Sequence, residues 1–227
     1  ILEKSELLHE TNPMIGTRGV RLGFVIPGLL KMQIKAIIEG ACQAKQKGLN
    51  PIPEIMVPLT VDVKELELVK PIFDEVYADM MEQYGAELEV KFGTMIEVPR
   101  ACLVSEEIAK VAEFYSFGTN DLHQMSLALS RDDSEGSFMQ KYYEWNLFSD
   151  SPFQTIDQEG VGRLMRMTIE NGRMTRSDLV VGICGEHGGD PQSIDFCHRL
   201  GMNYVSCSPF RIPIARLAAA QALLKNH

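Results

Sequence analysis

The sequence predicts an α/β fold of the (β/α)8 TIM-barrel type, present here as about five β/α units that form one domain over residues 1–227. From residue 54 onward, short apolar runs alternate with helical patterns, which is typical of a parallel sheet with crossover helices. Polar residues gather where these runs end, as on the active-site face of a barrel. A complete barrel needs about eight strands. Either three strands precede residue 1, or the sheet is open and doubly wound.

The first elements are two helices with a strand between them. A helix is expected over about 27–47, because Pro27 stands near its start and Gly48 follows its end. Apolar residues at helical spacing give it one inward face, formed by Leu30, Ile34, Ile37, Ile38 and Ala41. The run over 53–59 is short, apolar and bounded by prolines, so it is predicted as a strand. Apolar residues at helical spacing predict the second helix over about 62–84.

The middle of the chain contains two strands and an irregular insertion. Apolar and charged side chains alternate over residues 88–92, and Met95 and Ile96 then lead to the carboxylate of Glu97, which predicts a strand that enters the core. A helix over about 101–112 is expected before the strand that begins at Tyr115. Residues 122–157 are the least regular part, and we expect two short helices there. This insertion is equally consistent with a mobile lid and with a rigidly packed excursion.

The last elements repeat the alternation of helix and strand. A helix is expected over about 158–172, followed by a nearly continuous apolar strand over 179–184 that is typical of burial on both faces. An Asp–Pro pair caps a helix over about 191–201. A short strand over 204–207 and a final helix from Pro213 complete the pattern. No Gly-x-Gly-x-x-Gly motif follows a strand, which disfavours a nucleotide-binding Rossmann domain.

Composition narrows the classes of partner. The 227 residues are 45% hydrophobic, enough for a substantial core, and carry a formal net charge of -9. No cluster of basic residues occurs, so a nucleic-acid partner is not expected. No apolar run reaches the ~20 residues that span a bilayer, and no signal peptide is visible. Because the chain starts at Ile1, we expect a fragment of a longer protein, in which a missing targeting signal decides nothing.

The cysteines indicate a reducing compartment. Five are present, no two of them form a Cys-x-x-Cys pair, and the odd, scattered set favours free thiols over disulfides or a zinc site. The cytoplasm and an organelle such as a plastid or a glycosome are both compatible with this. Cys184 differs from the others because glycines and a Glu–His pair follow it.

The candidate site lies at the ends of three predicted strands. Gly118, Thr119, Asn120 and Asp121 follow the strand at Tyr115, and by themselves they are also consistent with an Asx-type turn that caps the next helix. Two other strands end in the same way, one at Glu97 and one at Cys184. Because the carboxyl ends of parallel strands meet at one edge, we expect these groups to lie together.

These residue types suit a divalent cation and an α-keto acid. Glu97 and Asp121, with no His or Cys partner in either motif, are ligands typical of Mg²⁺ or Mn²⁺. Such an ion stabilises an enolate as a Lewis acid. Arg18 offsets the remaining negative charge, and Asn120 donates to substrate oxygens. Cys184, as a thiol of ordinary pKa ~8.5, is a suitable acid toward an enolate carbon.

The segment that precedes the first long helix contains two arginines. Arg18 and Arg21 lie three residues apart in a glycine-rich stretch, so on one helical turn they would share a face. Two guanidinium groups on one side of a loop suit a carboxylate or a phosphate. An ordinary surface loop with solvated arginines is the alternative.

Several blocks in fixed order make the chain resemble the C-terminal domain of the pyruvate, phosphate dikinase family of phosphoenolpyruvate (PEP)-utilising enzymes. The resemblance runs through nearly the whole chain. PEP synthase and the phosphotransferase-system entry enzyme share the Gly-Thr-Asn-Asp block and a Cys-Gly pair, but the sequence after that pair favours the dikinase. The resembling blocks are residues 12–23, 53–59, 93–100, 114–124, 151–153, 182–191 and 204–220.

The resemblance implies a (β/α)8 barrel that binds pyruvate or PEP with Mg²⁺ and converts one into the other through an enolate. It implies Mg²⁺ ligands at Glu97 and Asp121, with Cys184 exchanging a proton at the substrate carbon. Arg18 and the Gly118–Asp121 block are implied as substrate contacts. In the family, a phosphohistidine on another domain delivers the phosphoryl group and the nucleotide binds elsewhere, so the fragment alone should be inactive. A homodimer is also implied.

Other functions remain open at this stage. One alternative is a PEP synthase-like enzyme, and another is a Mg²⁺-dependent lyase or aldolase that acts through a pyruvate enolate. Both would use the metal ion and the arginine in the same roles, although aldol chemistry does not specifically require the thiol of Cys184. A further alternative is an inactive remnant that only binds a ligand or mediates dimerisation. His187, although close to Cys184 in sequence, is expected to be structural or to support the residues that touch the substrate, because the family's phosphoryl carrier lies on a different domain.

Overall fold

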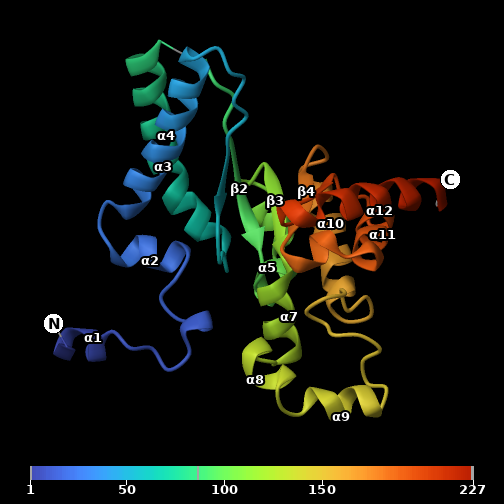
Figure 1. Cartoon of the computed structure of the whole chain (residues 1–227). Coiled ribbons are helices and arrows are strands. Elements are labelled where there is room, and N and C mark those ends of the chain that lie inside the picture. Colours follow the sequence, from blue (N-terminus) through green and yellow to red (C-terminus); the bar gives the residue numbers. More distant parts are fainter. Residues whose placement is uncertain (1, 86, 226–227) are drawn as a thin grey trace.

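The computed structural model describes residues 2–85 and 87–225. A parallel sheet occupies the centre, and helices follow its strands along the chain (Figure 1). The strands are β1 (Glu54–Val57), β2 (Lys91–Ile96), β3 (Phe114–Gly118), β4 (Val180–Cys184) and β5 (Tyr204–Val205). The helices are α1 (Leu2–Leu7), α2 (Val20–Val25), α3 (Leu29–Gln46), α4 (Val63–Tyr84), α5 (Pro99–Leu103), α6 (Ser105–Ile108), α7 (Thr119–Leu127), α8 (Arg131–Glu135), α9 (Met139–Glu144), α10 (Val161–Thr175), α11 (Pro191–Arg199) and α12 (Ile212–Lys225), with short 3-10 turns η1 (Pro13–Ile15), η2 (Glu186–Gly189) and η3 (Pro209–Arg211).

The strand order decides between the two predicted architectures. Within the described residues the sheet has five strands in the order β1-β2-β3-β4-β5, and every neighbouring pair is parallel. A doubly wound sheet reverses its strand order at a switch point, whereas a barrel adds each strand beside the previous one. The sheet is therefore singly wound, and the predicted α/β fold, a partial barrel, is confirmed.

The outward face of the sheet packs against the helices. Alternate strand residues Phe92, Ile96, Phe117 and Ile183 are completely buried in the main hydrophobic core. The ring of Phe92 lies 5.3 Å from that of Phe73 in α4. The positions next to them along each strand point to the opposite face, so Glu97, directly after β2, lies on the same face as Gly118 and Cys184.

Local sequence fixes the ends of the long helix α4. Asp62 and Glu65 form a capping box, in which the Asp62 carboxylate accepts from the backbone N–H of Lys64 and the Glu65 carboxylate accepts from that of Asp62. Gly85 ends the helix in the left-handed region, at φ 55°. The expected helix over 62–84 is confirmed to within a residue.

Two details of the expected elements are wrong. The helix over 101–112 is instead two short helices, α5 and α6, because the backbone leaves the helical region at Val104, where φ is -117° and ψ is 26°. In α3, Ile37 was expected on the inward face but is 46% exposed. The buried stripe of this helix is narrower than the sequence pattern suggests, since it comprises only Ile34, Ile38, Ala41 and Cys42.

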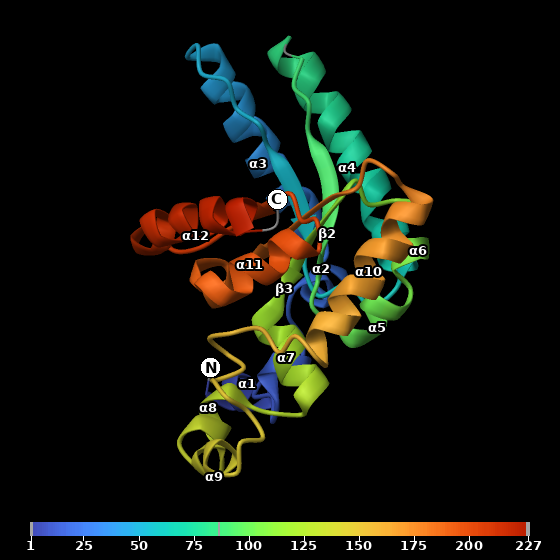
Figure 2. The ribbon, with the colours of Figure 1, turned by 90° about the vertical axis from the view of Figure 1, so that its right-hand side faces the viewer.

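The irregular insertion contains the two short helices expected there, α8 and α9, after the helix α7. Figures 1 and 2 both place α7, α8 and α9 at the end of the molecule toward which β3 runs. A separate small core holds the insertion together through Leu129, Met139 and Phe153. All five cysteines are free, as expected. Across residues 2–85 and 87–225, we find no helix that combines the length and the apolar character needed to cross a membrane.

Candidate active site at the carboxyl ends of the strands

The strand register brings the three predicted strand ends to one level. Ile96 of β2 pairs with Phe117 of β3, so Glu97 follows beside Gly118. Gly118 in turn pairs with Cys184 of β4. Because side chains alternate along strands, all three positions face the same side of the sheet. The register therefore brings Glu97, Gly118 and Cys184 together at one edge of the sheet, as expected for the three strand ends.

Glu97 is held in place by a backbone group that the sequence did not indicate. Its side chain is only 4% exposed, and its Oε1 atom accepts a hydrogen bond of 2.7 Å from the N–H of Leu59. Leu59 has φ 60°, an uncommon conformation for a non-glycine residue. This strained turn after β1 directs the N–H toward the carboxylate.

Gly118 makes room for Glu97. A Cβ atom at this position would lie 2.6 Å from Oε2 of Glu97 and 2.8 Å from Sδ of Met95, closer than real carbon atoms approach such neighbours. The absence of a side chain therefore allows the carboxylate to lie against the end of β3. Gly118 acts by leaving this space free.

Burial, and to a smaller extent the negative charge of Asp121, raises the pKa of Glu97 to about 7. The hydrogen bond from Leu59 and the charge of Arg18 act in the opposite direction but are weaker. Near neutral pH the group is therefore poised between its protonated and ionised forms. A bound cation would favour the ionised form.

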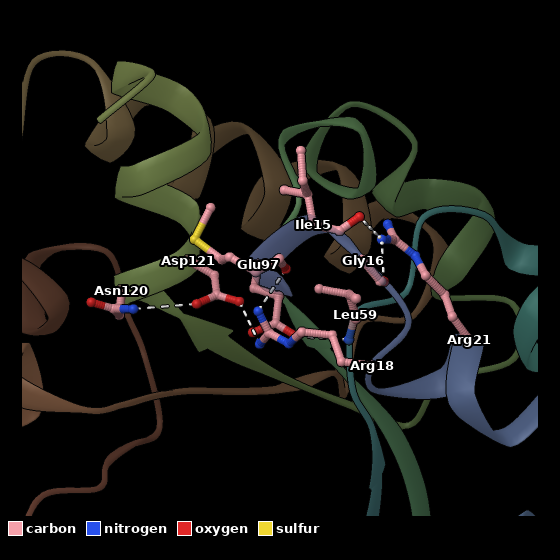
Figure 3. Close-up of polar contacts among 9 residues, drawn as sticks. Ile15, Gly16, Arg18, Arg21, Leu59, Glu97, Asn120 and Asp121 are labelled. Carbon is pink, nitrogen blue, oxygen red and sulfur yellow. Dashed lines mark hydrogen bonds and ion pairs between the residues drawn. The ribbon is translucent and has the colours of Figure 1, made fainter. Parts of the chain in front are cut away.

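Arg18 and Asp121 form an ion pair across two segments that are far apart in sequence (Figure 3). Nη2 of Arg18 lies 2.6 Å from Oδ2 of Asp121, and Nη1 of Arg18 donates to the carbonyl oxygen of Met14. Asn120 donates to Oδ1 of Asp121 over 3.2 Å. The close 2.6 Å contact is an attraction between charges rather than an aligned hydrogen bond, because Oδ2 accepts no hydrogen bond of good geometry from the described residues.

The two arginines do not act together. Arg21 turns away from Asp121, and its guanidinium donates to the carbonyl oxygens of Ile15 and Gly16 (Figure 3). The predicted shared face is therefore wrong, because Arg18 precedes α2 and Arg21 lies within it. Arg18 belongs to the site, whereas Arg21 holds the shape of the loop.

Cys184 lies beside the carboxylates as a protonated thiol. It is partly exposed, and its sulfur donates to the carbonyl oxygen of Phe117 over 3.5 Å. Burial raises the pKa of the Cys184 thiol, a hydrogen bond with Ser116 lowers it, and the charges of Glu97 and Asp121 raise it. The net effect keeps the proton on sulfur.

Thr119 is placed differently from the other residues of its block. It is completely buried, and its hydroxyl oxygen lies 2.7 Å from Nδ1 of His187. His187 is itself buried, and its other ring nitrogen lies 2.9 Å from the carbonyl oxygen of Pro152. This partnership of Thr119 and His187 could not be predicted from the sequence, since the two residues lie 68 positions apart.

The carboxylates suit a divalent cation that keeps ligands from solvent or substrate. Among the residues that the structure describes, no three His, Cys, Asp or Glu side chains converge in a way that could hold a metal ion. Glu97 and Asp121 thus offer two carboxylates, and the buried Oδ2 atom of Asp121 still lacks a hydrogen bond. Mg²⁺ is commonly bound by one or two carboxylates plus substrate oxygens and water. The donor set therefore fits Mg²⁺.

A cavity of about 990 Å³ opens beside the ion pair. Its wall combines the amino-terminal segment, through residues such as Asn12 and Arg18, with Asn120 and Asp121 of α7 and Asp132 of α8. Glu97 and Cys184 are not among its lining residues. The cavity thus reaches the site from the side of Arg18 and Asp121.

The fold and the site together define a class of protein, an α/β partial barrel with paired carboxylates, an arginine and a thiol at the carboxyl ends of its strands. The family model described as PEP-utilising enzyme, PEP-binding domain, matches residues 1–224. The chain belongs to this family of PEP-utilising enzymes.

Curated relatives confirm the resemblance to the dikinases. The chain is 52% identical over 224 residues to pyruvate, phosphate dikinase of Clostridium symbiosum, covering 98% of this chain and 26% of the relative. It is 49% identical over 225 residues to that of Giardia intestinalis, covering 99% and 25%. It is 51% identical over 224 residues to the chloroplastic enzyme of Flaveria bidentis, covering 99% and 23%. The chain thus spans about a quarter of the length of these relatives.

A solved structure supports the fold alone. The crystal structure of a citrate lyase from Burkholderia xenovorans LB400 matches with a TM-score of 0.54 and 13% sequence identity. The match covers 83% of this chain and 53% of the lyase. At this identity the likeness extends to the arrangement of helices and strands.

Proposed function

We propose that this chain forms the pyruvate- and PEP-binding half-site of a pyruvate, phosphate dikinase. In the whole enzyme, ATP, pyruvate and phosphate would be converted to AMP, PEP and diphosphate, with a phosphohistidine on another domain carrying the phosphoryl group. The observation that supports this most directly is the convergence of Glu97, Asp121, Arg18 and Cys184 at the ends of three neighbouring strands. The relatives' name, pyruvate, phosphate dikinase, supports the class of reaction.

Glu97 and Asp121 would hold Mg²⁺, which when bound supplies Lewis-acid stabilisation of negative charge on substrate oxygens. Arg18 adds a positive charge next to Asp121, and its side chain is 39% exposed, so an anionic substrate can reach it. Asn120 lies at the start of α7 with an amide that can donate to a substrate oxygen. Together these groups would bind and orient a small keto acid, pyruvate, or its phosphorylated enol form, PEP.

Cys184 would exchange the proton at the substrate carbon. In the direction of pyruvate formation, PEP loses its phosphoryl group to the histidine of the other domain and leaves an enolate. The thiol of Cys184 then gives its proton to the methylene carbon, and the resulting methyl group completes pyruvate. The raised pKa of Cys184 keeps this proton available near neutral pH. The reverse direction returns the methyl proton to sulfur.

Calorimetric titration with Mg²⁺ and then PEP tests the proposal. We expect PEP to bind only when Mg²⁺ is present, because the carboxylates otherwise repel it. Cys184→Ala in the full-length enzyme should abolish turnover between pyruvate and PEP and leave autophosphorylation from ATP intact. The absence of heat for either ligand would favour an inactive remnant, and survival of both partial reactions would remove Cys184 from the mechanism.

A further inference from the structure

Two histidines lie stacked behind the candidate site. His123 in α7 and His187 in η2 are 0% and 1% exposed, and their ring centroids are 4.7 Å apart with planes inclined by 19°. Every ring nitrogen of the pair has a polar partner within 3.0 Å, formed by Thr119, Pro152 and Asp157. Such complete pairing in a buried site indicates defined roles for each nitrogen.

The partners of His123 decide its tautomer. The backbone N–H of Asp157 can only donate, and it lies 3.0 Å from Nε2 of His123. Nε2 therefore accepts, and the proton is on Nδ1, which donates to the carbonyl oxygen of Thr119 over 2.6 Å. Burial, together with the neighbouring His187, lowers the pKa of His123 to about 4, which agrees with this neutral ring.

The partners of His187 require the opposite tautomer. The carbonyl oxygen of Pro152 can only accept, so the proton of His187 is on Nε2. Nδ1 of His187 is then an acceptor, and the hydroxyl of Thr119 donates to it over 2.7 Å. Burial lowers the pKa of His187 as well. The two stacked rings thus carry their protons on different nitrogens.

This arrangement fixes the direction of the Thr119 hydroxyl. Its hydrogen is directed to His187, while the carbonyl oxygen of Cys184, at 3.4 Å, is a much poorer acceptor. Thr119 is consequently held by two hydrogen bonds: its hydroxyl donates to His187, and its carbonyl oxygen accepts from His123. Since Thr119 begins the helix that carries Asn120 and Asp121, the pair ties that turn to the segment that follows Cys184.

We infer that His187 is a positioning residue for the pyruvate–PEP reaction, acting as an Nε2–H tautomer that takes the hydroxyl hydrogen bond of Thr119 and so locks the first turn of α7 beside Cys184. This inference rests on the proposed function. Because the hydroxyl hydrogen of Thr119 is directed to His187, this hydroxyl can still accept a hydrogen bond but cannot donate one to a substrate carboxylate. Among the described side chains of the candidate site, Arg18 and Asn120 remain as donors to substrate oxygen atoms.

Two replacements of His187 separate this role from simple filling of the core. In His187→Asn, the amide oxygen takes the place of Nδ1 and can still accept from Thr119, but the hydrogen bond to Pro152 is lost. In His187→Gln, the amide nitrogen lies near the position of Nε2 and can still donate to Pro152, but the hydrogen bond from Thr119 is lost. In the full-length enzyme we expect His187→Gln to lower kcat of the pyruvate–PEP half-reaction about tenfold, as for loss of one buried hydrogen bond. The His187→Asn variant should retain most of the wild-type kcat of this half-reaction, and autophosphorylation from ATP should be unchanged in both variants.

Equal losses in the two variants, or full activity of His187→Gln, would overturn the inference. Thr119→Ser, which keeps the hydroxyl, should behave better than Thr119→Val by a similar factor in kcat. Histidine nitrogen NMR spectra of isotope-labelled full-length enzyme should show one ring protonated at Nδ1 and the other at Nε2. The same tautomer on both rings would overturn the assignment whatever the activity, whereas a wild-type enzyme that fails to bind PEP with Mg²⁺ would refute the proposed function alone.

Discussion

Replacement of Glu97 by Gln is expected to stabilise the metal-free chain above neutral pH while weakening its response to Mg²⁺. The pKa of Glu97 is raised from 4.5 to about 7, chiefly by burial and then by Asp121. This difference corresponds to about 3 kcal/mol of unfavourable free energy for the ionised carboxylate in the folded state. Gln has nearly the same shape, carries no charge, and can still accept the hydrogen bond from Leu59.

The sign follows from proton linkage. Below about pH 4.5 the carboxyl group is protonated in both the folded and the unfolded chain, so it has little effect on stability. Between about pH 4.5 and 7 only the unfolded chain loses the proton freely, so folding stability falls as pH rises. Above about 7 the penalty is complete. Glu97→Gln removes it, so the free energy of unfolding of the variant relative to wild type should be higher at pH 8 than at pH 5, by at most about 3 kcal/mol.

Urea denaturation at these two pH values, without divalent cations, measures the effect. Glu89→Gln, at an exposed position, serves as the matched control. Addition of Mg²⁺ at pH 8 should stabilise the wild type and the control and should stabilise Glu97→Gln much less. A Glu97→Gln advantage that is independent of pH would refute the argument from buried charge, and equal stabilisation by Mg²⁺ would remove Glu97 from the ligand set.

Three further results are expected. Gly118→Ala should lower the free energy of unfolding by about 1–3 kcal/mol through overpacking against Glu97. Gly40→Ala, in an exposed part of α3 with no atom near the added carbon, should raise it by about 0.5–1 kcal/mol. Urea unfolding measures both variants, and similar effects would contradict the packing argument. Arg18→Met should weaken Mg²⁺-dependent PEP binding, measured by calorimetry, by about 10–100-fold. Arg21→Met should weaken it less, and a larger effect of Arg21→Met would show that the wrong arginine has been assigned to the site. Turnover of the full-length enzyme should persist to higher pH than an ordinary thiol allows, because the pKa of Cys184 is raised; a loss of activity beginning below the usual thiol range would argue against Cys184 as the acid.

The candidate site could be predicted where its residues follow strands directly. Glu97, the Gly118–Asp121 block and Cys184 each end an apolar run, and parallel strands bring such ends together. Their function as ligands, acid and substrate contacts stays a prediction until the titrations are done. Leu59 gave no signal, because neither its side chain nor its neighbours indicate a positive φ.

The fold class, the order of the units, the family and the positions of the chemical groups along the chain could all be predicted from the sequence, because hydrophobic periodicity and strand ends are local properties. Three features became visible only in the folded chain: Arg18 rather than Arg21 pairs with Asp121, Gly118 leaves space for Glu97, and the Thr119 hydroxyl donates its hydrogen bond to His187. Each of these depends on atoms far apart in the chain, whose distances and orientations exist only once the strands have been placed side by side.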